Sequence, residues 1–262
     1  MKNIFLCLLV CVFGKVQAQT ATFNDQPWLQ NFPIIIDPYD GNDLDFPKIK
    51  TNMQVVGLLH RASIGMRADE KYLERSVLSN ENKLKYASYH LGRKGNPVGQ
   101  ADFYLDIIKN NLNEPMALDI EEIGGNNISL ADAEIFIRRI HEKTGKYPLL
   151  YINNAVFNAI NAKYGRDSEF AKCRLWYARF LKKLPTLSTK VWDKVTIWQF
   201  ACEINCNPCL IEDTKGHCIK RANRYDANCP YKVTGTDFNM DVNVFNGSID
   251  ELLAFWNTYQ NP

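Results

Sequence analysis

Short runs of apolar residues recur along the chain, and most of them are apolar throughout. Such runs are typical of strands that are buried on both faces, as in a parallel sheet covered by helices. The pattern predicts eight strands, at residues 34–36, 55–62, 84–90, 116–120, 147–152, 174–180, 195–200 and 241–245.

Segments with helical spacing separate most of these strands. We expect helices at residues 46–51, 70–78, 99–110, 130–143, 155–164 and 249–256. Ser129 is the expected N-cap of the helix at 130–143, and Gly145 ends it. The links from strand six to seven and from seven to eight contain no clear helix. Eight strands alternating with helices predict a single α/β domain, an irregular (β/α)8 TIM-like barrel of parallel strands.

The first 18 residues have the pattern of a secretory signal peptide: Lys2, an apolar run at 4–13, and Val16-Gln17-Ala18 as a cleavage site. The run is too short to span a bilayer, and no later segment could do so. We therefore expect an exported protein, extracellular, or periplasmic where the host has an outer membrane. Removing 18 of 262 residues leaves 244, which suits one large domain as well as two small ones.

The mature charge is balanced, because removing Lys2 and Lys15 leaves 29 basic residues against 29 acidic ones. This balance gives no indication of binding to nucleic acid or to an anionic membrane. The histidines are scattered without metal-ligand spacing, so we expect no metal and no cofactor.

Six cysteines remain after removal of the first 18 residues, and an even number in an exported chain predicts disulfides: Cys173, Cys202, Cys206, Cys209, Cys218 and Cys229. The sequence does not choose their pairing. Five of them lie in a polar segment, about residues 201–234, which has too little apolar pattern to form its own core. We interpret it as a disulfide-rich insertion. A zinc knuckle of Cys202, Cys206, Cys209 and one more cysteine is the alternative.

Two acids stand at the end of the fourth predicted strand. Alternate side chains of a strand share a face, so Asp119 and Glu121 point to one side and Leu118 and Ile120 to the other. Crowded carboxylates raise the pKa of one member, which can then act as a general acid, as cleavage of a glycosidic bond requires. On this motif alone, an exposed acidic turn is the alternative.

The position of these acids in the barrel favours a catalytic site over an exposed acidic turn. Active sites of such barrels lie at the carboxyl ends of the strands. Asp37 ends the first strand and Asp241 lies in the eighth, and these strands are neighbours in a closed barrel. We therefore expect Asp37 and Asp241 to join Asp119 and Glu121 at one mouth.

Several motifs, in this order along the chain, carry a family resemblance: Ile35-Ile36-Asp37, Tyr89-His90, Leu118-Asp119-Ile120-Glu121, Leu175-Trp176-Tyr177, Trp198-Gln199-Phe200 and Asp241-Val242-Asn243. The sequence from residue 34 to about 255 resembles glycoside hydrolase family 25, the Chalaropsis-type lysozymes. Members of this family cleave the β-1,4 bond between N-acetylmuramic acid and N-acetylglucosamine in peptidoglycan.

The resemblance implies a role for each acid. Glu121 would be the general acid, and Asp119 would stabilise the acetamido group of the substrate or the oxazolinium-like species that it forms. Asp37 and Asp241 would hold the protonation state of this pair and the position of the sugar. Stereochemistry stays open, with substrate-assisted retention favoured over inversion.

The resemblance also implies that four residues bind the sugar: Tyr89, Tyr151, Trp198 and Gln199. Core packing is the alternative for the three aromatic residues, and it is the preferred interpretation of Trp176. The expected partner is the peptidoglycan glycan strand, bound by a monomer.

Three departures from the family pattern lie around the expected groove. Ile64 stands where the family often has a glutamate, Pro38-Tyr39-Asp40 replaces the usual residues after the first aspartate, and the cysteine-bearing insertion is long. They leave two alternatives open. One is a hydrolase of chitin or another acetamido-glycan, and the other is a peptidoglycan-binding protein without catalytic activity.

Overall fold

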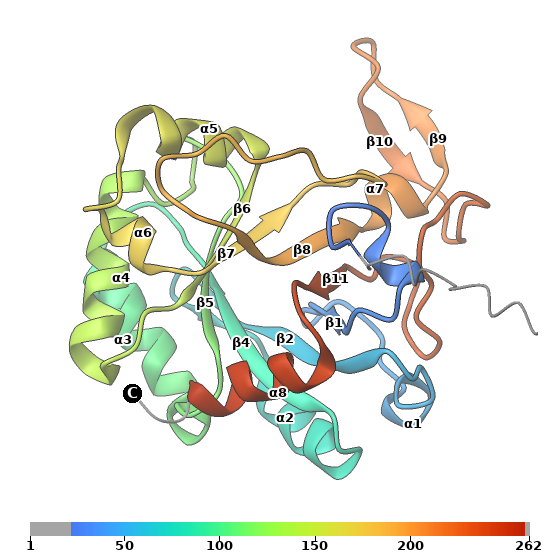
Figure 1. Cartoon of the computed structure of the whole chain (residues 1–262), viewed down its shortest axis with the longest axis horizontal. Helices are drawn as coiled ribbons and strands as arrows, with labels where there is room; N and C mark the ends of the chain where they lie inside the picture. Colours follow the sequence, from blue (N-terminus) through green and yellow to red (C-terminus); the bar gives the residue numbers. More distant parts are fainter. Residues whose placement is uncertain (1–21, 260–262) are drawn as a thin grey trace, which may run out of the picture.

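Eight strands close a barrel in the computed structural model, which describes residues 22–259 (Figure 1). The predicted signal peptide lies outside the described residues. The pairing of β1 with β2 completes the ring. The barrel strands are β1 (Ile34–Ile36), β2 (Val55–Ile64), β4 (Lys85–Leu91), β5 (Met116–Ile120), β6 (Leu149–Asn153), β7 (Leu175–Ala178), β8 (Val195–Ala201) and β11 (Val242–Phe245). The predicted irregular α/β barrel is confirmed.

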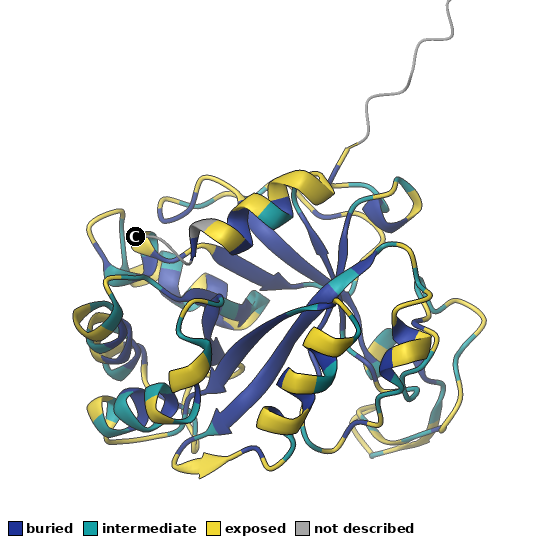
Figure 2. Ribbon diagram, turned by 90° about the horizontal axis from the view of Figure 1, so that it is seen from below, coloured by how far each residue is buried: buried dark blue, intermediate teal, exposed yellow. Residues whose placement is uncertain are grey.

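Helices surround the barrel with their polar faces outward, whereas the strands are buried (Figure 2). Ser129 caps α4 as predicted, since its hydroxyl accepts a hydrogen bond from the Asp132 N–H at 3.0 Å. No helix within residues 22–259 is long and apolar enough to cross a membrane. The α-helices are α1 (Phe46–Ile49), α2 (Tyr72–Glu81), α3 (Pro97–Ile107), α4 (Leu130–Thr144), α5 (Asn154–Lys163), α6 (Glu169–Lys172), α7 (Glu203–Cys206) and α8 (Ile249–Thr258), with 3-10 turns η1 (Pro27–Leu29) and η2 (Lys109–Asn111).

One strand runs against the predicted direction. We expected a wholly parallel sheet, but β11 pairs antiparallel with both of its neighbours, β1 and β8. The chain leaves the carboxyl end of β8 into the cysteine-rich insertion and has no crossover helix to return it to the other end of the barrel. It therefore enters β11 from the mouth, where the other strands end.

The core has two layers. Side chains between the barrel and the helices form the outer one, and inward-facing side chains such as Ile35, Leu59 and Ala117 form the inner one. The inner layer includes residues of α8, which follows β11. Trp256 of α8 donates to the Tyr86 carbonyl at 3.3 Å, and Tyr259 donates to the Tyr147 carbonyl at 2.7 Å. Since Tyr86 and Tyr147 lie near the starts of β4 and β6, α8 closes the amino-terminal end of the barrel.

The cysteine-rich insertion is stapled by two disulfides, Cys206–Cys229 and Cys209–Cys218. The second of these links β9 (Cys209–Glu212) to β10 (Cys218–Arg221), a hairpin that projects from the barrel in Figure 1. A further two-residue strand, β3 (Arg67–Ala68), pairs antiparallel with the end of β2. The zinc-knuckle alternative is wrong, because Cys206 and Cys209 are both oxidised.

The prediction that all six cysteines form disulfides is wrong for two of them. Cys173 and Cys202 are free and buried. Cys173 caps the end of α6 just before β7 begins, and Cys202 follows the end of β8. They therefore lie at opposite ends of the barrel, separated by about the length of a strand, roughly 3.3 Å per residue, which no disulfide can bridge.

The closure of the barrel by α8 predicts a large effect of Trp256→Ala. The side chain is fully buried, so its loss should lower the free energy of unfolding by about 3–5 kcal/mol. Urea denaturation measures the difference. Met53, which is 95% exposed, provides the control, because Met53→Ala should change stability by no more than about 0.5 kcal/mol. Similar effects of the two substitutions would contradict this account of α8.

Candidate active site

The four predicted acids meet at the carboxyl-terminal mouth of the barrel. Asp37 follows β1, Asp119 lies near the end of β5, Glu121 follows β5 and Asp241 precedes β11. The Asp37 N–H donates to the Asp241 carbonyl at 3.2 Å. The reversed direction of β11 brings Asp241 here, because the amino end of that strand lies at the mouth.

Asp37 is held by amide donors. It is 7% exposed, and its carboxylate accepts hydrogen bonds from Gln199 Nε2 at 3.0 Å and from Asn243 Nδ2. Two aromatic side chains orient these amides: Trp176 Nε1 donates to Asn243 Oδ1 at 2.6 Å, and the Tyr151 hydroxyl donates to Gln199 Oε1 at 2.7 Å. Burial nevertheless raises the pKa of Asp37 well above its usual value. Gln199, predicted to bind the sugar, here supports Asp37.

Asp119 and Asp241 have fewer partners. One carboxylate oxygen of each is buried and has no hydrogen-bond partner among the described residues. Burial raises the pKa of Asp119 well above its usual value, and the charges of Glu121 and Asp37 raise it further. Burial also raises the pKa of Asp241, and Asp37, Glu203, Glu121 and Asp119 add to the effect. Both aspartates therefore retain protons at a pH where exposed aspartates have lost them.

Glu121 differs from the aspartates because its side chain is exposed at the mouth. Loss of hydration against the walls of the mouth raises its pKa, while the nearby Arg93 guanidinium lowers it. The Asn153 side-chain amide donates to the Glu121 carbonyl, and Asn153 Oδ1 also caps α5. The backbone of Glu121 is thus fixed while its carboxyl group can reach a ligand, as a general acid requires.

Three aromatic residues line the barrel beneath the acids. Tyr89 and Tyr151 both pack edge-on against Trp176, with ring centroids 6.1 Å and 4.8 Å apart. The charges of Asp37, Asp119 and Asp241 act on both tyrosines, and burial keeps the pKa of each well above its usual value. Both tyrosines are therefore neutral hydrogen-bond donors next to the acids. Trp176 is buried core, as preferred from the sequence.

Trp198 does not reach the mouth, so the prediction that it binds the sugar is wrong. Strand alternation turns Gln199 inward and Trp198 outward, where it is fully buried against Phe23 and Trp28. Its indole N–H donates to the Arg179 carbonyl at 2.6 Å. Trp198 is a packing residue between the barrel and the amino-terminal segment.

The two histidines beside the barrel are structural. Burial lowers the pKa of His60 to about 3 and that of His90 to about 4, so both are neutral. His90 is bonded to Ser63 at 2.8 Å and lies 3.2 Å from Gln100 Oε1. These contacts give His90 a structural role.

Sequence reasoning missed three residues that act on the acids. Asn243 lies within the Asp241-Val242-Asn243 motif but was not identified as a partner of Asp37. Arg93 follows β4 and Glu203 begins the short helix α7, and no local sequence pattern reveals that either lies near the acids. Glu203 starts α7, and its carboxylate lies within 4.8 Å of the ligand atoms of Asp241 and Cys202, a group that could hold a metal ion.

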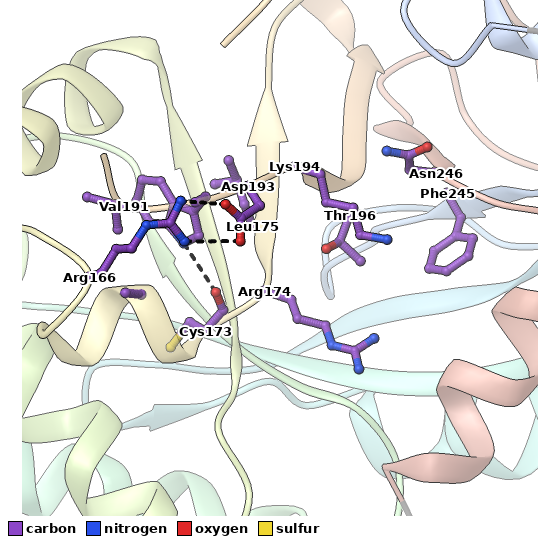
Figure 3. Close-up of a pocket in the computed structure, with 12 residues that line it drawn as sticks. Arg166, Cys173, Arg174, Leu175, Val191, Asp193, Lys194, Thr196, Phe245 and Asn246 are labelled. Atoms are coloured by element: carbon purple, nitrogen blue, oxygen red, sulfur yellow. Dashed lines mark hydrogen bonds and ion pairs between the residues drawn. The ribbon is translucent and has the colours of Figure 1, made fainter. Parts of the chain in front are cut away.

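A cavity of about 560 Å³ lies at the other end of the barrel (Figure 3). Its lining includes Arg174 and Thr196 at the starts of β7 and β8, and Asn246 just after β11. Arg166 and Asp193 form an ion pair across it, with N–O distances of 2.5 and 3.1 Å. None of the predicted catalytic or sugar-binding residues lines this cavity, so it is separate from the acids.

Comparison with known proteins gives a family match. The family described as "Glycosyl hydrolases family 25" matches residues 36–207. This range contains Asp37, Asp119 and Glu121 and ends before Asp241. No curated protein sequence matches the chain.

Solved structures share the fold at low sequence identity. A bacterial lysozyme from Streptomyces coelicolor superposes with a TM-score of 0.66 at 19% identity, over 87% of this chain and 98% of that one. A muramidase from Acremonium alcalophilum gives 0.64 at 20% identity, over 86% and 99%. A family GH25 lysozyme from Aspergillus fumigatus gives 0.63 at 19% identity, over 86% and 98%.

The different surroundings of two aspartates predict opposite stability effects. A pKa raised by folding contributes stability that is lost as pH rises, because the folded state then holds a proton that the unfolded state has released. Asp119→Asn removes the ionisable group, and with it the stability lost on raising the pH. The variant should therefore be more stable than the unmodified protein at pH 7 by roughly 0.5–2 kcal/mol. The gain should fade as the pH falls towards about 4, where the unfolded state also takes up the proton.

Asp37→Asn should destabilise the protein by roughly 1–3 kcal/mol, because the new amide donor would face the Gln199 or Asn243 amide donors. Thermal unfolding of both variants at pH 4 and pH 7 measures these differences. A stabilising Asp37→Asn, or an Asp119→Asn gain that is unchanged at pH 4, would contradict the assigned surroundings.

Proposed function

The chain belongs to glycoside hydrolase family 25, and we propose that it is an exported muramidase that hydrolyses the β-1,4 bond between N-acetylmuramic acid and N-acetylglucosamine in peptidoglycan. The observation that carries this proposal is the convergence of Asp37, Asp119, Glu121 and Asp241 at one mouth. Structures with the same fold that are described as a lysozyme and a muramidase support the choice of substrate.

Glu121 acts as the general acid in this proposal. It is the most exposed of the four acids and its pKa is raised, so it can carry a proton to the oxygen of the leaving sugar. As the bond from the anomeric carbon to that oxygen breaks, the bonding electrons leave with the oxygen, which takes the Glu121 proton. The carboxylate left on Glu121 then serves as the base for the incoming water.

Asp119 stabilises the positive charge that develops on the sugar. It is buried near the end of β5, two residues before Glu121. The acetamido oxygen of the substrate can attack the anomeric carbon and form an oxazolinium-like intermediate, so no second carboxylate has to attack. Developing positive charge favours the carboxylate form of Asp119. Water then attacks the anomeric carbon, which opens the oxazolinium-like ring, and gives a proton to Glu121. The product is the retained anomer.

Asp37 and Asp241 complete the acid cluster of the site. Asp37 is fixed by Gln199 and Asn243, and Tyr89 and Tyr151 supply neutral hydroxyl groups beside the acids. Sugar hydroxyl and acetamido groups can bond to such donors and acceptors.

Export and a monomeric state are part of the same proposal. The pattern of residues 1–18 and the two disulfides support export to an oxidising compartment. One chain supplies all four acids, so the site needs no second subunit.

Glu121→Gln should reduce the hydrolysis of purified peptidoglycan by roughly 10²–10⁴-fold, because the amide has no proton to donate. Borohydride reduction of the products should reveal reduced muramic acid for the unmodified protein. Glu122→Gln is the matched control, since Glu122 is the exposed acid next in sequence, and it should retain activity.

Other outcomes would replace the proposal. Reduced glucosamine ends would indicate a glucosaminidase, and turnover of chitin oligomers alone would indicate a chitin hydrolase. Binding to peptidoglycan without any new reducing ends would indicate a non-catalytic binding protein.

Arg93→Gln should move the alkaline limb of the pH profile of kcat/KM to higher pH. The Arg93 guanidinium lowers the pKa of Glu121, so without it Glu121 stays protonated, and active as an acid, further into the alkaline range. Arg166→Gln, at the other end of the barrel, should leave the profile unchanged. A shift to lower pH in Arg93→Gln would refute Glu121 as the acid.

A further inference from the structure

The antiparallel pairing of β11 with β8 places a cysteine near a catalytic aspartate. Val242 pairs with Ala201, and Asp241 and Cys202 are the next residues of the two segments towards the mouth. Glu203 follows Cys202 as the first residue of α7. The Cys202 sulfur and one carboxylate oxygen from each acid lie within 4.8 Å of one another.

Cys202 is buried, whereas Glu203 and Asp241 are partly exposed, and the group has few hydrogen bonds. Cys202 is 3% exposed and remains a free thiol beside two disulfides. Its sulfur accepts the Ile204 N–H at 3.3 Å, a bond that stabilises a thiolate. A buried Asp241 oxygen has no hydrogen-bond partner among the described residues. Burial and the charges of Asp241 and Glu203 raise the pKa of the Cys202 thiol, so a cation that took up all three groups would relieve their repulsion.

The geometry is held in place by its surroundings. The Cys202 N–H donates to Asn205 Oδ1 at 3.0 Å, and Asn205 Nδ2 donates to the Phe200 carbonyl at 2.9 Å. The Cys206–Cys229 disulfide fixes the other end of α7. Because both α7 and the ladder are constrained, the three side chains need little ordering to bind a ligand together.

We propose that Cys202, Glu203 and Asp241 form a site for a thiophilic divalent cation such as Zn²⁺, and that the bound cation inhibits hydrolysis by engaging Asp241. Zn²⁺ takes thiolate and carboxylate ligands in tetrahedral geometry, and three protein ligands leave one position for water. Binding converts the Cys202 thiol to a thiolate and releases its proton to solvent. Mg²⁺ and Ca²⁺ prefer oxygen ligands only. The inhibitory effect rests on the proposed function of the acid cluster, whereas the binding of metal does not.

Cys173 supplies a matched control. It is the other free, buried cysteine among the described residues, and its thiol donates to the Glu169 carbonyl at 3.5 Å. It lies at the other end of the barrel, away from Asp241.

Titration with Cd²⁺, followed by the thiolate-to-cadmium charge-transfer absorption, tests the site without any assay of activity. The unmodified protein and Cys173→Ser should both show a band that saturates at a single Cd²⁺ per chain, and Cys202→Ser should lack it. No band in the unmodified protein, or a band retained in Cys202→Ser, would overturn the proposal.

Inhibition by Zn²⁺ tests the consequence. Zn²⁺, but not Mg²⁺, should slow peptidoglycan hydrolysis, and Cys202→Ser or Glu203→Gln should raise the half-inhibitory concentration at least ~10-fold. Glu203→Gln covers the case in which Cys202→Ser fails to fold. Equal inhibition of the unmodified protein and both variants would overturn the inhibitory role. If no glycan is hydrolysed at all, the proposed function fails, and the Cd²⁺ titration still decides the metal site.

Discussion

The direction of one short strand determines how the active site is assembled. β11 fills the last gap in the barrel, and it does so antiparallel to β1 and β8. A parallel strand would have placed Asp241 at the closed amino-terminal end, about the length of the strand from the other acids. The reversed strand places Asp241 at the mouth, puts Asn243 next to Asp37, and lets α8 close the opposite end of the barrel.

The acid cluster lowers the stability of the fold. The same raised pKa values allow the proposed acid catalysis. Asp119 and Asp241 each have a buried carboxylate oxygen without a hydrogen-bond partner in residues 22–259, and neighbouring acids raise the pKa of both. Well-packed neutral residues would be more stable here. Only a strained, partly protonated set of acids can donate a proton and also stabilise positive charge near neutral pH. Asp37 shows the contrast, because its amide partners make it part of the scaffold.

The sequence predicted what depends on local pattern. The apolar runs located all eight barrel strands, and strand-end position selected Asp37, Asp119 and Glu121. Asp241 begins the eighth predicted strand and was included because that strand neighbours the first. Prediction from the sequence failed for features that depend on tertiary contacts. Trp198 lies in a strand whose inward and outward faces are both apolar, so alternation could not show that it points outward. The all-parallel sheet was wrong because no pattern marks strand direction. The pairing of the cysteines depends on which end of the barrel each one reaches.

The topology of the barrel places the start of the cysteine-rich insertion next to the candidate active site. Because β11 must start at the mouth, any segment between β8 and β11 leaves from the mouth and returns to it. The first residues of that segment therefore lie beside Asp241, whatever the rest of it does. In this chain those residues are Cys202 and Glu203, and the disulfide at Cys206 holds them there. A change in the insertion can thus alter the charge around the four acids without altering the barrel, which is the basis of the proposed inhibition at Cys202.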